Sequence, residues 1–552
     1  MRSSRLLCFP ALVALLGTAS CNGCSKKGPD LSAAVVEAPV AAPASLLAEG
    51  SIENPDAFWG KLQKGMGGLA GLMPSSTGGL LSALTSIDSA IAPVIDGASP
   101  AYAASVGTPS ASRWAFAVRL TDLPHARQAL FDGPAAKYTA TDDGDFVLLA
   151  PKVPPATPAA YSFAIAKTGY LVVAKTKENV EEIGPYLVRT MPTHARATSD
   201  ATIDVPHAAL AGPIHDELAQ KWKSQKDELS ASAADEADAH GREADLADPA
   251  GVLAATDQAM QKRLAALADV ASIHVTFNAS ADLVDAEAIV TPGDGNGPAA
   301  QWLATTNQGD LAPLLDAPQG YGSVLWRTSD ADRASLPGDG QQLLEQVFSS
   351  RLDASQKAAA RQALTDWAAG VGDHTVVSAS SAPVFAVRVS TPTTHPDAIA
   401  KGTREGLELV KKAVDSGDFK RFLGETRVTF GTDDVVGVGK VSTFKIDRFE
   451  DDDVSAAWLT QNGVFKLVVA SDASAAIGAQ AEKQASWRED TRVTPRVLAL
   501  GPHVSLAAVG KPVAADPNAF VLGTFGLDGS RGKATLTVSD TVLRERLGDL
   551  AK

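Results

Sequence analysis

The sequence predicts an α+β fold with two tandem related domains, each an antiparallel sheet packed with helices, the first with an inserted helical hairpin. A pattern of strand, glycine turn, strand and helix at Tyr161–Ile183 recurs at Ser455–Gly478, and in both copies the second strand ends in Val-Val-Ala. Two further markers flank this pattern in the same order in each half. At 552 residues the chain is also too long for one ordinary hydrophobic core.

The repeated hairpin has a physical basis. Asn462-Gly463 between apolar runs favours a type I′ turn, which needs positive φ at both central residues, and Thr168-Gly169 is a weaker version of the same turn. The second copy has two more residues between its glycine and Val-Val-Ala, and two residues preserve the side-chain parity of a strand. Thr176 and Asp472 follow Val-Val-Ala at the same offset, where a side-chain oxygen can cap a helix.

The two flanking markers complete the repeat. The first is the tetrapeptide Phe-Ala-Val-Arg, which is followed in both halves by a turn and a helix start with a histidine nearby. The second is Thr-Phe, which leads through a turn to a closing apolar strand. These markers are Phe116–Arg119 and Phe385–Arg388, then Thr276-Phe277 with Ala286–Val290, and Thr524-Phe525 with Ala534–Val538. The predicted order in each half is strand, helix, strand, hairpin, helix and closing hairpin.

Composition shifts place the domain boundaries. Turn-rich stretches break the chain near residues 292–298 and 308–322. The predicted organisation is a signal peptide at 1–20, a lipidated cysteine and flexible tether at 21–44, a first repeat at 45–295, a linker at 296–319 and a second repeat at 320–552.

The first repeat begins with a strand, Leu46–Glu53, and Asn54-Pro55 then starts a helix, because Asn caps well and Pro is tolerated at the first helical position. Residues 65–87 carry no charge, and we expect two short helices broken around Pro74–Gly79. One interpretation is a buried helix pair. The other is an adaptable apolar surface that contacts lipid or a partner, through Met66, Leu69, Leu72, Met73, Leu80, Leu81 and Leu84.

The first repeat contains an insertion that the second lacks. Residues 207–270 are expected to form an antiparallel helical hairpin, because apolar residues recur at helical spacing in both arms. The inward residues are Ile214, Leu218 and Trp222 in the first arm, and Leu253, Met260, Leu264 and Leu267 in the second. The acidic, alanine-rich stretch between the arms is expected to be a solvated helix extension or a loop.

The second repeat opens with a predicted strand at Ser323–Arg327. Helices are expected around Gln341–Phe348 and Gln356–Ala369, and a long hairpin is expected at Arg427–Phe449.

The N-terminal segment has the layout of a secretory signal. Arg2 and Arg5 precede an apolar run, Leu6–Leu16, which is too short to span a bilayer, and small uncharged residues lead to Cys21. The segment resembles the lipobox-type signal of bacterial lipoproteins, with Thr18 where these signals usually have Leu. The resemblance implies that Cys21 is lipidated and becomes the mature N-terminus of an Ala-rich envelope lipoprotein, tethered to the membrane. Ordinary secretion with cleavage near Ser20 is the alternative.

Composition excludes several functional classes. A formal net charge of −15 argues against nucleic-acid binding, which needs a basic face. All three cysteines lie in the first 24 residues, so the folded body has no disulfide, thiolate metal site or cysteine nucleophile. A Cys21–Cys24 bridge is the alternative if Cys21 is not lipidated.

The candidate catalytic and metal motifs are incomplete, and we predict no cofactor and no metal. Residues 437–440 end like a phosphate loop, but Val441 replaces the hydroxyl residue, and Asp528 replaces the first glycine of a nucleophile elbow at 529–532. Both are interpreted as turns or strands. Five residues at 235–243 could bind calcium or zinc weakly, although a solvated loop has the same composition: Asp235, Glu236, Asp238, His240 and Glu243.

These observations favour a noncatalytic, exported envelope lipoprotein, on the outer membrane or a periplasmic face, whose tandem domains bind an envelope protein or an apolar ligand such as lipid. An envelope hydrolase whose site is assembled only in the fold is the first alternative, and a pocket with a histidine and two carboxylates would favour it. A structural spacer is the second.

Overall fold

A computed structural model of the chain describes residues 34–66, 71–153, 160–240, 249–347, 353–380, 385–415, 426–448, 453–481, 485–511, 516 and 518–544. Its strands pair antiparallel and its helices pack against them, so the protein has the predicted α+β class. The chain divides into two compact units. Unit 1 comprises Met1–Glu217, Ser272–Ala286 and Leu543–Lys552, and unit 2 comprises Leu218–Ala271 and Glu287–Val542.

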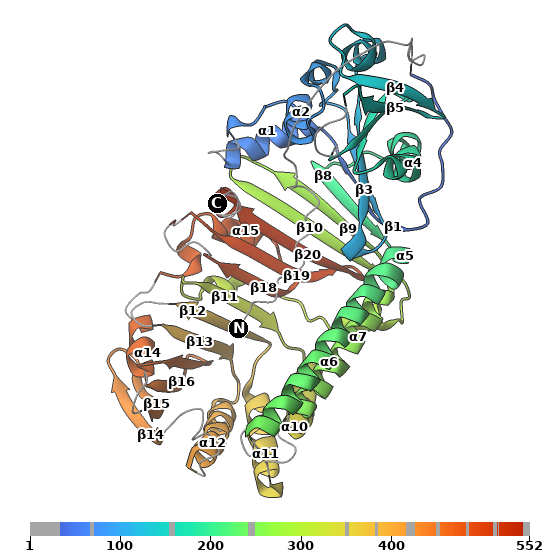
Figure 1. The fold of residues 1–552 in the computed structure, drawn as a ribbon. Coiled ribbons are helices and arrows are strands. Elements are labelled where there is room, and N and C mark those ends of the chain that lie inside the picture. Colours follow the sequence, from blue (N-terminus) through green and yellow to red (C-terminus); the bar gives the residue numbers. More distant parts are fainter. Residues whose placement is uncertain are drawn as a thin grey trace. The chain divides into compact units, whose positions relative to one another are not determined.

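The strands of unit 1 pair in the order β4, β5, β6, β7, β3, β2, β1, β8, β9 and β10, and the second half of β10 belongs to unit 2 (Figure 1). Their bounds are β1 (Leu46–Ile52), β2 (Ala101–Val106), β3 (Arg113–Arg119), β4 (Tyr138–Asp143), β5 (Phe146–Pro151), β6 (Ser162–Ala166), β7 (Tyr170–Ala174), β8 (Ala201–Pro206), β9 (Val270–Ala279) and β10 (Leu283–Pro292).

The strands of unit 2 pair in the same order with every number raised by ten, from β14 through β17, β13, β12, β11 and β18 to β20. Their bounds are β11 (Gly322–Arg327), β12 (His374–Ser380), β13 (Ala386–Pro392), β14 (Thr426–Val435), β15 (Gly439–Arg448), β16 (Val454–Gln461), β17 (Val464–Ala470), β18 (Val504–Gly510), β19 (Val521–Asp528) and β20 (Arg531–Ser539). The repeated order supports the predicted duplication. The repeat bounds 45–295 and 320–552 stay a prediction. Units 1 and 2 are defined by contacts between residues, and such contacts do not show where a duplicated segment begins or ends.

In unit 1, helices cover both faces of the sheet around β7. Leu171 and Val173 point into a core formed with α2 (Thr77–Thr85), the short helices η2 (Ser89–Val94) and η4 (Gln128–Asp132), and α3 (Leu123–Arg127). Tyr170 and Val172 point into a second core formed with α4 (Lys177–Pro185) and the π-helical turn η5 (Tyr186–Thr190). All five residues of β7 are buried. The first helix of the unit is α1 (Pro55–Met66), and the turn η6 spans Met191–Thr193.

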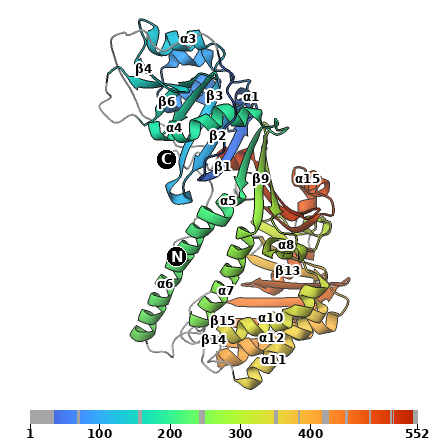
Figure 2. The ribbon, with the colours of Figure 1, turned by 90° about the vertical axis from the view of Figure 1, so that its right-hand side faces the viewer.

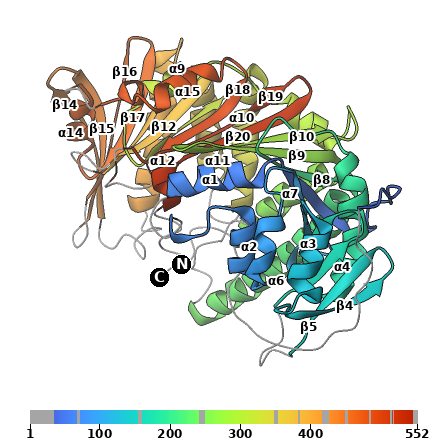
Figure 3. The same cartoon turned by 90° about the horizontal axis from the view of Figure 1, so that it is seen from above.

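In unit 2, helices again pack on both faces of the repeated hairpin. Trp458 and Phe465 face α11 (Ala354–Gly370) and α12 (Pro396–Asp415), which lie side by side with α10 (Asp330–Val347) in Figure 2. Ala457 and Val468 face α14 (Ala473–Ala481), which lies beside β14 and β15 (Figure 3). The remaining helices are α8 (Pro298–Ala304), α9 (Ala312–Leu315), the turn η8 (Trp487–Glu489) and α15 (Val493–Ala499).

The structure confirms the second copy of the hairpin and corrects the turn of the first. Asn462 and Gly463 both have positive φ, +53° and +74°, as a type I′ turn requires. In the first copy Gly169 has φ +91°, but Thr168 does not have positive φ. Ala166 pairs with Tyr170, so this loop has three residues and needs the left-handed conformation at only one of them.

The extra two residues of the second copy are visible in the strand register. Ala117 of the first Phe-Ala-Val-Arg lies opposite Val172, the first residue of Val-Val-Ala, whereas Ala386 lies opposite Ala470, the last residue of that motif. The register thus differs by two residues, and the same side chains keep facing the same way. The predicted parity argument is confirmed.

The predicted helical hairpin forms between β8 and β9. It begins with α5 (His207–Ala209) and the turn η7 (Leu210–Ile214), and its arms are α6 (His215–His240) and α7 (Pro249–Ala268). Trp222 donates its indole N–H to Asp257 Oδ1 at 2.7 Å, and the Lys226 ammonium contacts Asp257 Oδ2 at 2.7 Å. Trp222 and Leu264 are buried, as predicted for the inward faces. The side chains of the acidic stretch at 235–243 lie outside the described residues.

Two local expectations agree with the structure. Asn54 caps α1, because its Oδ1 accepts the Ala57 N–H at 2.9 Å. Both motifs rejected as catalytic lie in hairpin turns.

Two other expectations differ from the structure in the extent of the helices. Helix α10 begins at Asp330, eleven residues before the predicted Gln341, and contains Pro337. The expected linker, 296–319, forms the short helices α8 and α9. Leu314 and Leu315 of α9 are fully buried, so this segment is part of the unit 2 core.

The two helix caps of the repeat give a paired test. Thr176 Oγ1 accepts the Asn179 N–H at 3.3 Å, and Asp472 Oδ1 accepts the Ala475 N–H at 2.9 Å. We expect Thr176→Ala and Asp472→Ala each to lower the free energy of unfolding by about 1 kcal/mol in urea titrations. Thr176→Ser and Asp472→Asn keep a capping oxygen and should cost a small fraction of that. If the Thr176→Ser and Asp472→Asn variants lost as much unfolding free energy as the alanine variants, the capping roles would be contradicted.

Candidate functional site

The uncharged stretch, residues 65–87, does not form one continuous surface in the described part of the chain. Leu81 is 6% exposed and belongs to the core of unit 1, whereas Leu72 is 82% exposed. Met73, Leu80 and Leu84 are half-buried. Leu69 and the side chain of Met66 lie outside the described residues. The proposed ligand or partner contact through these seven residues stays a prediction, and of its second half Leu81 lies in the core.

Hydrogen bonds to α1 hold the loop that carries Leu72. The Trp59 indole N–H donates to the Pro74 carbonyl at 2.8 Å, and the Gln63 amide donates to the Met73 carbonyl at 2.8 Å. Asp56 Oδ1 accepts the Thr77 N–H at 2.6 Å at the start of α2. This loop therefore has a defined path across α1, and Leu72 is presented at its outer side.

Cys21 lies outside the described residues, but the end of the expected tether is held on unit 1. The Val35 N–H donates to the Lys167 carbonyl at 2.8 Å, beside the Gly169 turn. Arg189 donates to the Ala38 carbonyl at 2.7 Å and lies 3.3 Å from the Glu37 carboxylate. We call residues 35–43 the strap. Arg189 also pairs with Asp145 at 2.8 Å, which fixes the guanidinium that holds the strap.

In unit 2, one face of the sheet carries no charged residue over five strands. Cross-strand pairs place Val324 opposite Val377 and Ala508, and Trp326 opposite Thr375 and Leu506. Directly opposite residues share a face. We call this set the uncharged face: Gly322, Val324, Trp326, Thr375, Val377, Ala379, Leu506, Ala508, Gly510, Gly523, Phe525, Ala534 and Leu536.

The opposite face of the same strands is covered by helices. Leu325, Ala507 and Val509 are buried there, and α9 contacts β11. The Trp487 indole N–H donates to Ser323 Oγ at 2.9 Å, which attaches η8 to β11. The cover of this face is therefore made by the chain itself.

The carboxylate of Asp490 joins η8 to α15 on the covered face. Burial alone would raise the pKa of Asp490. Hydrogen bonds from the Val493 and Arg492 amides, together with the Lys511 ammonium at 3.1 Å, outweigh burial and lower the pKa below its usual value. The carboxylate therefore stays ionised at neutral pH, and its bonds to the first turn of α15 persist.

Large apolar side chains of the uncharged face remain in contact with solvent. Trp326 is 38% exposed, Leu506 43% and Leu536 45%. At one end of the face the rings of Trp302 and Phe525 pack in a tilted arrangement with centroids 5.2 Å apart. Apolar side chains that are exposed side by side, rather than singly, often mark a binding surface. The uncharged face is therefore the main candidate binding surface of unit 2.

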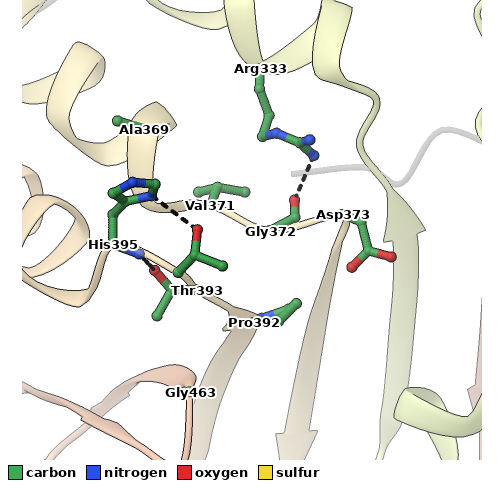
Figure 4. Close-up of a pocket in the computed structure, with 10 residues that line it drawn as sticks. Arg333, Ala369, Val371, Gly372, Asp373, Pro392, Thr393, His395 and Gly463 are labelled. Carbon is green, nitrogen blue, oxygen red and sulfur yellow. Dashed lines mark hydrogen bonds between the residues drawn. The ribbon is translucent and has the colours of Figure 1, made fainter.

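A pocket of about 580 Å³ opens at the ends of β12 and β13 (Figure 4). Arg333 lines it from α10, Asp373 from the segment before β12, and His395 from the segment before α12. Gly463, from the turn of the repeated hairpin, completes the lining, and its carbonyl accepts the Thr393 N–H at 2.8 Å.

Local structure fixes each polar group of the pocket. Ser329 and Asp332 cap the start of α10 reciprocally, which places Arg333 in its first turn. The backbone passes Pro392 so closely that a Cβ on Gly372 would lie 2.4 Å from the Pro392 carbonyl oxygen, which explains the glycine. Thr393 Oγ1 accepts the His395 N–H at 3.1 Å at the entry to α12.

A row of polar side chains crosses three strands of unit 1. Glu49 of β1 lies opposite Asp204 of β8, which lies opposite His274 of β9 and contacts its Nδ1 at 2.6 Å. Tyr186 donates to Glu49, and His194 lies 3.7 Å from the same carboxylate. Burial, followed by the hydrogen bond to Glu49, raises the pKa of Tyr186, so its hydroxyl remains a donor. These groups are partnered with one another, which ties β1, β8 and β9 together.

The sequence contained one overlooked sign of the uncharged face. A strand with one solvated face alternates apolar and polar residues, whereas Val324-Leu325-Trp326 is a continuous apolar run. Such a run predicts apolar contacts on both faces. The contribution of Arg333 to a pocket had no sequence signal, because its segment was not predicted to be helical.

Comparisons with known proteins identify no relative from which function can be taken. No family model matches, and no curated protein sequence matches. Among solved structures, crystal form I of TP0453 is 10% identical, with a TM-score of 0.19, and covers 44% of this chain and 98% of its own. Crystal form III of TP0453 is also 10% identical, with a TM-score of 0.16, and covers 43% and 97%. Likeness at this level carries no argument about fold or function.

Two general properties of the described residues bear on the site. No group of three or more His, Cys, Asp or Glu side chains among them has an arrangement that could hold a metal ion. No helix within the described ranges is long and apolar enough to cross a membrane.

The strap can be tested with a protease. Glu37 lies in the strap, so cleavage by a Glu-specific protease after this residue requires the strap to detach. Charge-assisted hydrogen bonds contribute about 1.5–3 kcal/mol each. We therefore expect Arg189→Ala to speed this cleavage about tenfold or more, measured by mass spectrometry of the released fragment. Lys177→Ala, which removes an exposed α4 cation that pairs with Glu181 and Asp143, is the control. An unchanged rate in Arg189→Ala would show that this arginine does not hold the strap.

Proposed function

We propose that this protein is a noncatalytic, exported envelope lipoprotein, anchored through Cys21, that binds the acyl chain of a lipid on the uncharged face of unit 2. The observation that carries the proposal is the exposure of Val324, Trp326, Leu506 and Leu536 on a sheet face that has no charged residue. Removing such area from water is favourable by about 25 cal/mol per Å². A bound apolar chain would supply that gain.

The composition of the face favours an acyl chain over a protein partner. A protein interface pairs the partner's polar groups with hydrogen-bonding side chains around an apolar centre. The uncharged face offers almost no hydrogen-bonding group to a partner. Its strand amides and carbonyls bond to neighbouring strands, and the hydroxyl-bearing Thr375 is buried. An acyl chain needs no such partner. A lipid anchor at Cys21 would also keep the protein beside a supply of acyl chains.

A protein partner and a structural spacer become outcomes of the binding test. An envelope protein partner would compete for the same apolar side chains but would not be extracted as lipid. A structural spacer would show neither competition by a protein partner nor lipid in the extract. The polar row of unit 1 brings two carboxylates and two histidines close together, but those groups are partnered with one another, so it adds no support for the hydrolase alternative.

Truncation of Trp326 tests acyl binding. Burying an aromatic side chain contributes about 1.5–3 kcal/mol, so Trp326→Ala should weaken binding of a pyrene-labelled acyl probe by about tenfold to a hundredfold. The Kd of the probe is measured by fluorescence titration of the full chain after any bound lipid has been removed. Leu498→Ala removes a comparably exposed residue of α15, away from the face, and should leave Kd unchanged. An unchanged Kd in Trp326→Ala, with no lipid in organic extracts of the purified protein, would refute the proposal.

Replacement of Cys21 tests the anchor separately. Stable attachment needs more than one acyl chain, because each buried methylene contributes about 0.8 kcal/mol. Cys21→Ala should therefore move the protein from the membrane fraction to the soluble envelope fraction, as measured by immunoblotting of fractionated cells. Cys24→Ala keeps the lipidation site and serves as the control. If Cys21→Ala fractionates with membranes like the parent, the anchor assignment is wrong.

A further inference from the structure

The pocket of Figure 4 lies beyond the end of β12, a strand of the uncharged face, and beside the end of the neighbouring β13. Thr375 of β12 belongs to the face, and Asp373, two residues earlier, lines the pocket. Thr391 of β13 lies opposite Phe465 of β17, and their chain neighbours Thr393 and Gly463 line the pocket. The recess thus lies beyond one end of β12, with the buried Thr375 between it and the exposed part of the uncharged face, and Arg333, Asp373 and His395 contribute its polar groups. An acyl chain on the face would have its headgroup at or near this recess.

The recess has the size of a small-molecule site. Its volume of about 580 Å³ lies within the range of about 300–1,000 Å³ usual for ligand pockets. It is formed by α10, the end of α11, the ends of β12 and β13, and the turn at Gly463. These elements are packed into the unit 2 core, so the recess is part of the folded scaffold.

Arg333 supplies the recess with an anion-binding group. Its Nη1 donates to the Thr328 carbonyl at 2.9 Å and to the Gly372 carbonyl at 3.1 Å, which fixes the guanidinium above the segment before β12 (Figure 4). Its Nη2 contacts Asp330. Guanidinium has five N–H donors, and these three bonds leave donors for a ligand. The Asp330 carboxylate is 96% exposed, so this ion pair is weak and easily displaced.

The carboxylate of the recess is already neutralised. Asp373 Oδ2 lies 3.0 Å from Arg327 Nη1, and its Oδ1 lies 2.8 Å from His374 Nδ1. A cationic headgroup would have to compete with both. His395 Nδ1 lies 3.0 Å from Thr394 Oγ1. Arg333 is therefore the cation that lines the recess and keeps N–H donors for an anion.

We propose that this recess binds the anionic headgroup of an amphiphile whose acyl chain lies on the uncharged face, with Arg333 as the residue that contacts the anion. The inference rests on the proposed function and adds the class of ligand: a single-chain or double-chain lipid with a carboxylate or phosphate at its head. Arg333 pairs with such groups through two parallel N–H donors, and a neutral headgroup makes no such pair. Binding selectivity between charged and neutral amphiphiles is the consequence.

Paired ligands of equal chain length test the headgroup. Displacement of the pyrene-labelled probe from the full chain gives the Kd of dodecyl phosphate and of dodecanol. The unmodified protein should bind dodecyl phosphate about tenfold more tightly than dodecanol. Arg333→Gln should remove that preference by weakening dodecyl phosphate alone, whereas Trp326→Ala should weaken both ligands. Arg361→Gln removes an exposed charge of α11 and should preserve the preference, which controls for net charge.

Several outcomes would overturn the inference without affecting the proposed function. These are an unmodified protein that binds both ligands equally, and an Arg333→Gln variant that weakens both to the same extent. If inorganic phosphate displaces the probe at the same concentration as dodecyl phosphate, the recess binds free phosphate and not a lipid headgroup. Failure of both ligands to bind the unmodified protein would instead refute acyl binding itself. Arg333→Lys should retain part of the preference, which guards against a variant that only unfolds the recess.

Discussion

Burial of the central hairpin on both faces is the constraint on which each unit depends. In β7 all five side chains are inside, because the odd positions face α2 and α3 while the even positions face α4 and η5. A strand buried on both faces is apolar at every position, which explains Val-Val-Ala in β7, whereas Lys466 and Val469 of β17 in unit 2 remain partly exposed. The helix that follows at once then closes one layer. In unit 2, Val468 and Phe465 of β17 divide in the same way between α14 and α12.

The parts that could be predicted were those fixed by local chemistry. The Asn462-Gly463 turn, the Thr176 and Asp472 caps, and the helical hairpin with Trp222 and Leu264 each depend on a few adjacent or regularly spaced residues. The repeated order of strands then followed from matching these markers in sequence.

The parts that were missed depend on tertiary contacts. Pro337 and its neighbouring glycines argue against a helix locally, yet α10 runs through them because it packs against α11 and α7. Thr168 avoids positive φ because a third loop residue was available. The uncharged stretch was overvalued as a site, since an apolar sequence alone does not distinguish Leu81 in a core from Leu72 at the surface. Residues of the uncharged face come from five separate strands, and their exposure depends on which helices cover them.

The two units differ in whether a helix covers the uncharged face or the equivalent face of unit 1. In unit 1, Ile52, Ala201 and Phe277 lie opposite one another or on neighbouring strands, and α1 covers them with Phe58 and Leu62. In unit 2 the helix that follows the equivalent strand is α10, and it packs against α11. Trp326 and Leu506 therefore lack the cover that α1 supplies in unit 1. Under the proposed function, an acyl chain on the uncharged face would supply the apolar contact that Phe58 and Leu62 of α1 supply in unit 1.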